Sequence, residues 1–283
     1  MDVDLLKTFL EVNRTRHFGH AADNLFISQS AVSARIRLLE DTVGVPLFTR
    51  SRHNIQLTSA GQRLLRYAEN MVTTWNQARQ AIALGDDDRV SLQVGGVTGL
   101  ADVVLQEWLH AVHRNFRDVA VQAEVHGQDV LMRRMQERTL DLCFTFEPPQ
   151  MAELMAQELG DMPLVLVATR DGLSPEEAVR EQYVLVDWGT AFSVNHARHF
   201  PDLPIPGLRV SLGRLALAFL LSCGGAAYLA EPMVREHLAT GRLHRVKEAP
   251  VIDRAAYAVY PVRSERREVI EKTLAGIAGI FRR

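Results

Sequence analysis

The chain has 283 residues, of which 47% are apolar and 23% are charged, and its formal net charge is −2. This length can bury two or three cores, and this composition excludes a fibrous, disordered or disulfide-stapled protein. Residues 1–84 hold 10 Lys and Arg against 7 Asp and Glu, which leaves 22 against 27 for residues 85–283. A mildly basic first part on an acidic body is typical of a nucleic-acid-binding end joined to a globular protein.

Cys143 and Cys223 are the only cysteines, and each lies in an apolar run. We expect two reduced, buried thiols; a redox pair is the alternative, although no basic neighbour lowers either thiol pKa. The first residues are acidic and form no secretory signal, and the most apolar segment, Leu215–Leu221, is far shorter than the roughly 20 residues that span a bilayer. We therefore expect a cytoplasmic protein that enters no membrane.

Two short helices are predicted first, one capped by Asp4 and ending near Arg14, the other over residues 18–25. A third helix should follow Ser28, a suitable N-cap. Its apolar stripe is predicted to face a core and consists of Val32, Ile36, Leu39 and Val43. The opposite face is small, polar and basic, with Gln29, Ser30, Ser33, Ala34 and Arg37. Such a face favours contact with DNA bases and phosphates, and an ordinary amphipathic surface helix is the alternative.

A small β-hairpin is predicted next, from two alternating runs, Leu47–Arg50 and Ile55–Leu57, around a turn-prone segment. The tip carries Arg50, Arg52, His53 and Asn54, a chemistry that suits a wing against a phosphate backbone or a minor groove. A solvated basic hairpin is the alternative. Two helices, a tight turn and this hairpin together predict a winged helix-turn-helix.

Residues 5–65 closely resemble the winged helix-turn-helix of LysR-type transcriptional regulators. The resemblance is carried by Phe9-Leu-Glu-Val, Phe18-Gly-His-Ala-Ala, Ser28-Gln-Ser-Ala-Val-Ser, Ile36-Arg-Leu-Leu-Glu, Gly44-Val-Pro-Leu-Phe-Thr-Arg and Leu57-Thr-Ser-Ala-Gly. Within the family, Leu6-Lys-Thr-Phe-Leu-Glu-Val and Arg14-Thr-Arg-His-Phe-Gly look most like the HdfR group, which is associated with flagellar-gene control.

The resemblance implies DNA contacts by seven residues: Gln29, Ser30, Ser33, Arg35, Arg37, Arg50 and Arg52. It also implies three kinds of partner: double-stranded DNA, further copies of this chain in a homodimer or homotetramer, and a small-molecule effector. RNA polymerase is another candidate partner. Position 30 is often Pro in the family and position 34 often long and polar or basic. Here they are Ser and Ala, which puts the base preference in doubt.

A long helix is predicted from Thr58 or Ser59 to about Leu84. One seam runs along it at heptad-like spacing: Leu64, Ala68, Met71, Trp75, Ala78 and Ile82. About 25 residues would span roughly 37 Å, enough to hold two DNA-binding heads apart as a dimer coil. A helix packed on its own domain is the alternative. The segment Gly85-Asp-Asp-Asp-Arg89 should end it and form a hinge.

Residues 90–283 alternate between strand-like and helix-like segments and predict an open α/β sheet. Strands are expected at 90–95, 119–126, 140–146, 162–169, 183–188, 226–230 and 255–262, and helices at 100–115, 130–138, 214–223, 233–240 and 263–281. The segment Leu220–Pro232 resembles the LysR-type effector domain, which has two α/β lobes like a periplasmic solute-binding protein. On that pattern, lobe I would hold residues 90–160 and 255–283 and lobe II residues 161–254, with crossovers near Asp161 and Asp253.

Familiar catalytic motifs are missing: there is no phosphate loop, no G-x-S-x-G elbow and no H-E-x-x-H. Gly95-Gly-Val-Thr-Gly99 could receive an anion at a helix start, but a tight turn explains it equally, with Asp102 balancing the helix dipole. Two pairs of histidines, His110 with His113 and His196 with His199, could lie together on helices. Two imidazoles are not a metal site, so we expect no metal, no cofactor and no catalysis.

Ligands of open α/β sheets bind beyond the carboxyl ends of strands. We therefore name Thr98, Thr145, Phe146 and Glu147 as effector-binding candidates, and the family resemblance favours the same places. Glu147 would repel an anion, so we expect a neutral or cationic effector, or none that binds strongly enough to detect. The alternative is that both threonines only satisfy strand-end backbone groups.

The sequence thus predicts three parts: a winged helix-turn-helix over residues 1–58, a linker helix and hinge over 59–87, and an α/β effector domain over 88–283. We expect a sequence-specific transcriptional regulator modulated by a small molecule. The alternatives are a solute-binding or metabolic α/β protein with a helical head, and a DNA binder without any effector.

Overall fold

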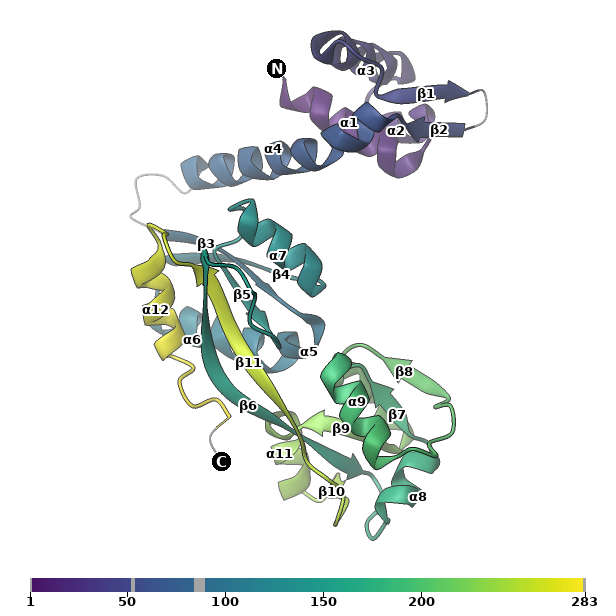
Figure 1. Cartoon of the computed structure of the whole chain (residues 1–283), viewed down its shortest axis with the longest axis vertical. Helices are drawn as coiled ribbons and strands as arrows, with labels where there is room; N and C mark the ends of the chain where they lie inside the picture. Colours follow the sequence, from purple (N-terminus) through teal and green to yellow (C-terminus); the bar gives the residue numbers. More distant parts are fainter. Residues whose placement is uncertain (1, 52–53, 84–89, 282–283) are drawn as a thin grey trace. The chain divides into compact units, whose positions relative to one another are not determined.

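The computed structural model describes residues 2–51, 54–83 and 90–281. The chain divides into two compact units, Met1–Asp87 and Asp88–Arg283, which can be followed by their colours in Figure 1. Each unit is organised around its own cluster of buried apolar side chains.

The first unit begins with three helices and a hairpin and ends in a long helix. Its elements are α1 (Val3–Thr15), α2 (Phe18–Leu25), α3 (Gln29–Val43), β1 (Phe48–Ser51), β2 (Asn54–Leu57) and α4 (Ser59–Ala83). Asp2, and not Asp4 as predicted, caps α1, because its side chain accepts the Asp4 amide at 3.0 Å. Asp4 instead lies in the first turn and pairs with Lys7 at 3.0 Å.

The apolar stripe of α3 faces the core of this unit, as predicted. Val32, Ile36 and Leu39 are at most 1% exposed. Burying one such side chain stabilises a fold by about 1.5–3 kcal/mol, so this stripe holds the helix in one rotational setting. The predicted fourth member is wrong, because Val43 is the last helical residue and remains 42% exposed.

The start of α4 lies close against the hairpin. The Thr58 hydroxyl accepts the Gly61 amide at 3.0 Å and thereby caps the helix. A side chain at Gly61 would place its Cβ 2.2 Å from the Leu47 carbonyl oxygen. Glycine is therefore required here for the helix to approach the hairpin backbone.

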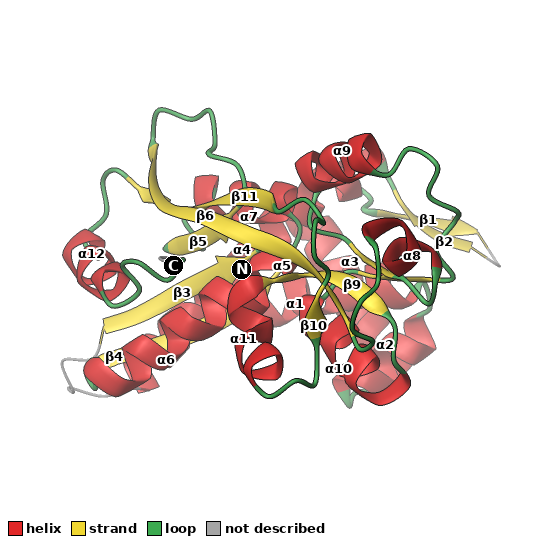
Figure 2. Cartoon of the chain, turned by 90° about the horizontal axis from the view of Figure 1, so that it is seen from below, coloured by secondary structure: helices red, strands yellow, loops and turns green. Residues whose placement is uncertain are grey.

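The second unit is an α/β domain, as predicted, built on a curled mixed sheet (Figure 2). Its elements are β3 (Val90–Gly96), α5 (Thr98–Leu100), the π-helix η1 (Ala101–Leu105), α6 (Gln106–Asn115), β4 (Val119–Val125), α7 (Gln128–Gln136), β5 (Leu142–Thr145), β6 (Leu154–Ala168), α8 (Pro175–Arg180), β7 (Val184–Val186), α9 (Thr190–His199), β8 (Leu208–Val210), α10 (Gly213–Cys223), β9 (Ala226–Ala230), α11 (Glu231–Ala239), β10 (His244–Arg245), β11 (Ile252–Pro261) and α12 (Arg267–Ala275).

The main sheet has the order β10-β6-β11-β5-β3-β4, with β9 also paired to β6. β3 runs parallel to both β4 and β5. The connections β3→β4 and β4→β5 cross the sheet in opposite directions, so right-handed crossovers place α6 and α7 on opposite faces. α12 packs beside α6 (Figure 1). It is shorter than the predicted 263–281 helix, since tight turns follow Ala275.

Two long antiparallel strands, β6 and β11, join the two lobes. Their pairing runs from Leu154↔Pro261 to Leu164↔Ile252, with Asp161 opposite Ala255. Near one end β11 also pairs with β5, and near the other β6 pairs with β9 and β10. β6 begins at Leu154 and not at Met162 as predicted, because its first half is only partly buried and lacks a continuous apolar run. The lobes are therefore connected by paired strands.

The two cysteines differ. Cys143 is buried in β5, and burial raises its pKa to about 12. Cys223 is exposed at the last position of α10, before Gly224 turns the chain at a φ of +83°. The expectation of two buried thiols is therefore wrong for Cys223.

A buried histidine lies in the second lobe. The His196 Nε2 atom is 2.8 Å from the Tyr183 hydroxyl, and the ring packs against Phe192, Phe200 and Tyr228. Burial is the main cause that lowers the pKa of His196 from 6.5 to about 4, and His199 adds to it. The charged imidazolium is excluded from this site because the folded core cannot solvate it.

This pKa predicts a stability change in acid. As the pH falls from 6.5 towards 4, the unfolded chain binds a proton at His196 that the folded domain does not, so stability is lost. We expect His196→Gln to reduce the fall in melting temperature across this window, measured by scanning calorimetry. His199→Gln, which changes an exposed histidine on the same helix, is the control and should keep most of the wild-type slope. An unchanged slope in His196→Gln would contradict the assignment.

Candidate functional site

The outward face of α3 is the first candidate site. Ser28 caps the helix by accepting the Ala31 amide at 3.2 Å. Four of the predicted contact-face residues are exposed and one, Ser33, is half-buried; the exposed ones are Gln29, Ser30, Ala34 and Arg37. The Ser30 hydroxyl lies 2.8 Å from that of Ser28, within the cap. The helix therefore presents short polar side chains at its start and a cation one to two turns later.

Glu40 connects this helix to the hairpin, a role that the sequence analysis missed. Its Oε1 atom accepts the amide of Leu47 at 2.8 Å and that of Phe48 at 3.3 Å. The carboxylate thus holds the first strand of the wing at the end of α3. A glutamate on the half-buried side of an amphipathic helix, just before a turn, was the available signal.

Arg35 is directed differently from the other predicted contacts. Its guanidinium lies 3.4 Å from the buried Thr8 hydroxyl and 4.0 Å from the Asp4 carboxylate, both on α1. In this structure Arg35 therefore connects α3 to α1. A contact with DNA would require the Arg35 side chain to leave Thr8.

The two predicted wing cations cannot be placed in the same detail. Arg50 belongs to β1 and is paired with Ile55, but its side chain lies outside the described residues. Arg52 lies outside them altogether.

The predicted seam of α4 has two different halves. Ala68 is 0% exposed, and Leu64 packs beside it against the core of the same unit. Further along the helix Met71 is 45%, Trp75 47% and Ile82 79% exposed. The first half thus serves its own domain, as the alternative predicted, and the second half leaves an apolar stripe uncovered by the described chain.

The predicted effector residues gather where the lobes meet. Thr145 is fully buried, and its hydroxyl donates to the Glu147 carbonyl oxygen at 2.9 Å, so this threonine satisfies a strand-end backbone group. Thr98 is partly exposed at the start of α5. Phe146 is 8% exposed and would lie 2.8 Å from a Cβ added at Gly99. Phe146 therefore lies against the chain at Gly99, the residue after Thr98, whereas the Thr145 hydroxyl is used by the backbone.

Arg254 is the residue of this region that the sequence analysis missed. It lies on β11, and its guanidinium carbon sits 4.5 Å from the centroid of the Phe146 ring. Its side chain is only 7% exposed, and its nearest carboxylate is Glu147 at 3.9 Å. The alternation Ile252, Arg254, Ala256 places the arginine on the buried face of the strand, which is the signal that could have revealed it.

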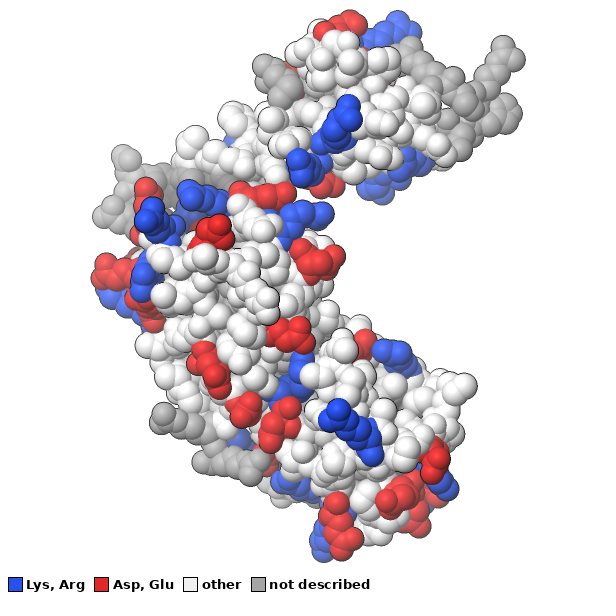
Figure 3. All heavy atoms as spheres, in the orientation of Figure 1, with Lys and Arg blue, Asp and Glu red and all other residues white. Residues whose placement is uncertain are grey.

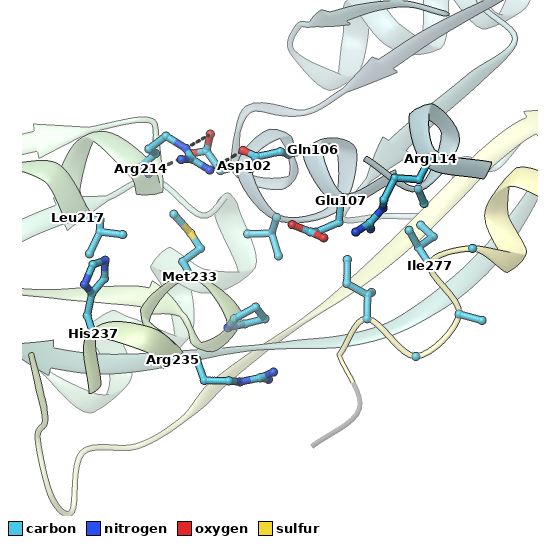
Figure 4. A pocket seen from close by; sticks show the side chains of 17 residues that line it. Asp102, Gln106, Glu107, Arg114, Arg214, Leu217, Met233, Arg235, His237 and Ile277 are labelled. Carbon is cyan, nitrogen blue, oxygen red and sulfur yellow. Dashed lines mark hydrogen bonds and ion pairs between the residues drawn. The ribbon is translucent and has the colours of Figure 1, made fainter. Parts of the chain in front are cut away.

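Figure 4 shows a further contact between the lobes. The Asp102 carboxylate of lobe I accepts the Arg214 amide at 2.9 Å, at the start of α10 in lobe II. The Arg214 side chain also reaches Asp102 and Gln106. Asp102 therefore balances the dipole of another helix, and not only that of its own as predicted. The surrounding cavity measures about 610 Å³ and is lined from both lobes.

Potential metal ligands do not cluster in the described part of the chain. No group of three or more His, Cys, Asp or Glu there could hold a metal ion. His196 is buried and His199 exposed, so the two imidazoles of this pair lie in different surroundings. Among the described helices, none is long and apolar enough to cross a membrane. Charges of both signs are interspersed on the face of the second unit seen in Figure 3.

A helix-turn-helix with a wing, a long helix and a two-lobed α/β domain together define a transcriptional regulator that combines a DNA-binding head with a ligand-binding body. Residues 3–62 match the family model of the bacterial regulatory helix-turn-helix protein, lysR family, and residues 85–278 match the LysR substrate binding domain. The chain therefore belongs to the LysR family of DNA-binding transcriptional regulators.

Relatives of established name agree with this assignment. The chain is 37% identical to the HTH-type transcriptional regulator HdfR of Yersinia enterocolitica, over 97% of this chain and 95% of that protein. The HdfR of Yersinia pestis is 36% identical over the same shares. The chain is thus a LysR-type regulator close to HdfR, as predicted.

Solved structures show the same fold. Full-length CbnR complexed with its target DNA has a TM-score of 0.72 at 16% identity, over 99% of this chain and 100% of that one. Vibrio fischeri DarR in complex with DNA has a TM-score of 0.58 at 20% identity, over 99% of each chain.

The contact between Glu40 and the wing generates a prediction. Glu40→Ala removes the acceptor for two backbone amides, which should destabilise the wing by roughly 1–3 kcal/mol. We expect faster hydrogen exchange at Leu47 and Phe48, measured by mass spectrometry on the full chain, and weaker DNA binding. Asp41→Ala, at the exposed neighbouring position, is the control. Unchanged exchange in the hairpin would show that Glu40 does not hold it.

Proposed function

We propose that α3 enters the major groove of double-stranded DNA and contacts it through Gln29, Ser30, Ser33 and Arg37, with Arg50 and Arg52 of the wing against the backbone. The observation that carries the proposal is the two-sided character of α3: the stripe of Val32, Ile36 and Leu39 is buried, and the opposite face carries exposed Gln29, Ser30, Ala34 and Arg37 with half-buried Ser33. Small residues allow close approach, Gln can make paired hydrogen bonds to base edges, and Arg37 can contact a phosphate. Arg35 joins this set only if it leaves α1.

The exposed half of α4 supports a second proposal, that two copies of the chain pair along this helix. Met71, Trp75, Ala78 and Ile82 continue the seam at alternating four- and three-residue spacing, and all four are exposed. A helix packs against a partner through such a stripe, and two heads are needed to engage two half-sites. Leu64 and Ala68, predicted for the same role, instead support the internal core. The assembly is a homodimer or a homotetramer.

The second unit is proposed to bind a small-molecule effector between its lobes, at Thr98, Phe146 and Glu147, with Thr145 behind them. Support comes from the convergence of strand ends of both lobes on this region. The parts of the protein are then the DNA-binding domain (residues 1–58), the linker helix and hinge (59–87) and the effector domain (88–283; lobe I 90–160 and 255–283, lobe II 161–254).

The similarity to HdfR supports flagellar or related genes as targets, with RNA polymerase as a further partner. We propose that the protein acts in the cytoplasm, where bacterial DNA lies, and that it performs no catalysis and needs no cofactor. A regulator without an effector is the second candidate, because the Thr145 hydroxyl is already used by the Glu147 carbonyl oxygen.

The α3 proposal separates specificity from general affinity. Gln29→Ala should cost about 1–3 kcal/mol at the cognate operator and leave binding to unrelated DNA nearly unchanged, because a base contact is lost. Arg37→Ala should weaken binding to all DNA and lower the salt slope by about one unit if the side chain contacts a phosphate. The measurement is fluorescence anisotropy with an operator identified by a genome-wide binding map.

The control for both variants is Asn76→Ala, which changes an exposed asparagine on α4. If Gln29→Ala, Ser33→Ala and Arg37→Ala all bound the operator as the unchanged protein does, the assignment of α3 would be wrong.

The α4 proposal predicts that Trp75→Glu shifts the protein towards monomer. The indole is 47% exposed in the single chain, so the change disturbs the fold of one copy little, but it places a charge in a dry dimer interface. Operator binding should fall with dimerisation, because the second half-site contact is lost. Sedimentation velocity measures the state of assembly. Thr74→Glu, at the exposed neighbouring position, is the control, and a fully dimeric Trp75→Glu protein would reject the seam.

A further inference from the structure

Lobe I contains a cavity to which none of the proposed effector residues contributes. It measures about 670 Å³ and is lined by the end of α7, the start of β6 and the end of β11, together with a few residues next to each. Neither Thr98 nor Phe146 is among the lining residues. Small-molecule sites of proteins typically measure about 300–1,000 Å³, so this cavity is large enough for a small organic ligand.

Part of the lining is apolar. Met135 of α7 is 2% exposed, and Leu154 of β6 is partly buried against the core of the second unit. Leu154 is paired with Pro261, the last residue of β11, and the Val262 amide donates to the Glu153 carbonyl oxygen at 2.9 Å. The apolar side chains are therefore held in place by α7 and by two paired strands. They offer an apolar ligand a surface that would otherwise contact water.

Two arginines, Arg138 and Arg263, line the same cavity. Both residues are exposed, and within the described chain neither side chain takes part in an ion pair or a hydrogen bond. Glu153 is the carboxylate of the lining, and it pairs with neither arginine. Two guanidinium groups against one carboxylate leave a net charge of +1 around the cavity. The cavity thus combines apolar surface with an excess of positive charge.

The backbone of Arg138 gives no reason for an arginine at this position. The Arg138 amide donates to the Met135 carbonyl oxygen at 3.2 Å, and the Thr139 amide donates to that of Arg134 at 3.0 Å. This pattern ends α7 and places Arg138 in the left-handed region, at a φ of +55°. Glycine adopts this conformation at lower cost and is the usual residue at such a helix end. For the fold alone, arginine is therefore less favourable here than glycine, while its side chain adds a charge to the cavity.

We propose that this cavity is a second small-molecule site, which binds a monocarboxylate with an apolar body. The carboxylate accepts hydrogen bonds from Arg138 and Arg263, since the planar guanidinium group matches the two oxygens of a carboxylate. The apolar body covers Met135 and Leu154. One negative charge on the ligand balances the excess positive charge of the lining. The site is independent of the effector region proposed between the lobes.

Calorimetric titration of the full chain, at neutral pH and constant ionic strength, tests the charge of the ligand. The probes are hexanoate with hexanamide and hexylammonium, and phenylacetate with phenylacetamide and phenethylammonium. We expect at least one carboxylate to bind, and its neutral and cationic counterparts to bind at least about fivefold more weakly. Equal binding of a carboxylate and its amide, or no binding by either carboxylate, would overturn the proposal.

Substitutions test the two arginines. Arg138→Gly and Arg263→Gln should each weaken carboxylate binding at least about fivefold, and Glu153→Gln should strengthen it by removing a repulsion. Arg138→Gly should melt at or above the temperature of the unchanged chain, because glycine suits the left-handed backbone, so a loss of binding does not reflect unfolding. Arg133→Gln, at an exposed position of α7 that does not line the cavity, is the control. Carboxylate binding that survives both arginine substitutions would contradict the assignment.

Hydrogen exchange measured by mass spectrometry locates the bound carboxylate. Its binding should slow amide exchange after the end of α7, at residues 136–139, and at the end of β11, at residues 260–263. Protection confined to residues 98–100 and 145–147, with binding lost in Thr98→Val, would assign the ligand to the region between the lobes and reject this site. Operator binding by the same preparations, measured alongside, reports on the DNA-binding function separately.

Discussion

The burial of three aliphatic side chains on α3 is the constraint on which the DNA-binding head depends. Val32, Ile36 and Leu39 can reach the core in only one rotational setting of the helix, so their burial determines which residues face outward. The short outer side chains then become a surface against which another molecule can lie closely. Glu40 extends the constraint to the hairpin by holding the backbone of Leu47 and Phe48. Core packing and the proposed DNA contacts are thus opposite faces of one helix.

The second unit depends on a comparable constraint, the pairing of β6 with β11 through both lobes. Paired strands resist separation but tolerate twist and a bulge, and the register of this pair shifts between Ala256 and Tyr257. Arg254 lies two residues before Ala256 on the same strand. The contact between Asp102 and Arg214 also lies between the lobes, and a change in lobe arrangement would alter it.

The linker helix is buried along one part of its apolar side and exposed along the other. Ala68 completes the interior of the DNA-binding unit, whereas Trp75 and Ile82, further along the same helix, remain exposed. A continuous heptad-like pattern does not predict this division, because the periodicity shows only that one side of the helix is apolar. Whether that apolar side packs against the same chain or against another copy depends on which residues lie opposite it in the folded protein.

Local patterns were sufficient for the elements that determine the family and the class of protein. The Ser28 cap, the α3 stripe, the hairpin and the alternation of strands and helices all follow from spacing and turn chemistry, which act within a few residues. Only tertiary structure decided that Arg35 turns to Thr8 and that Cys223 is exposed. It also decided which charges lie together beside Phe146. Glu147 and Arg254 are more than 100 residues apart in sequence. The electrostatic interaction between them depends on their distance and burial, which only the folded sheet defines.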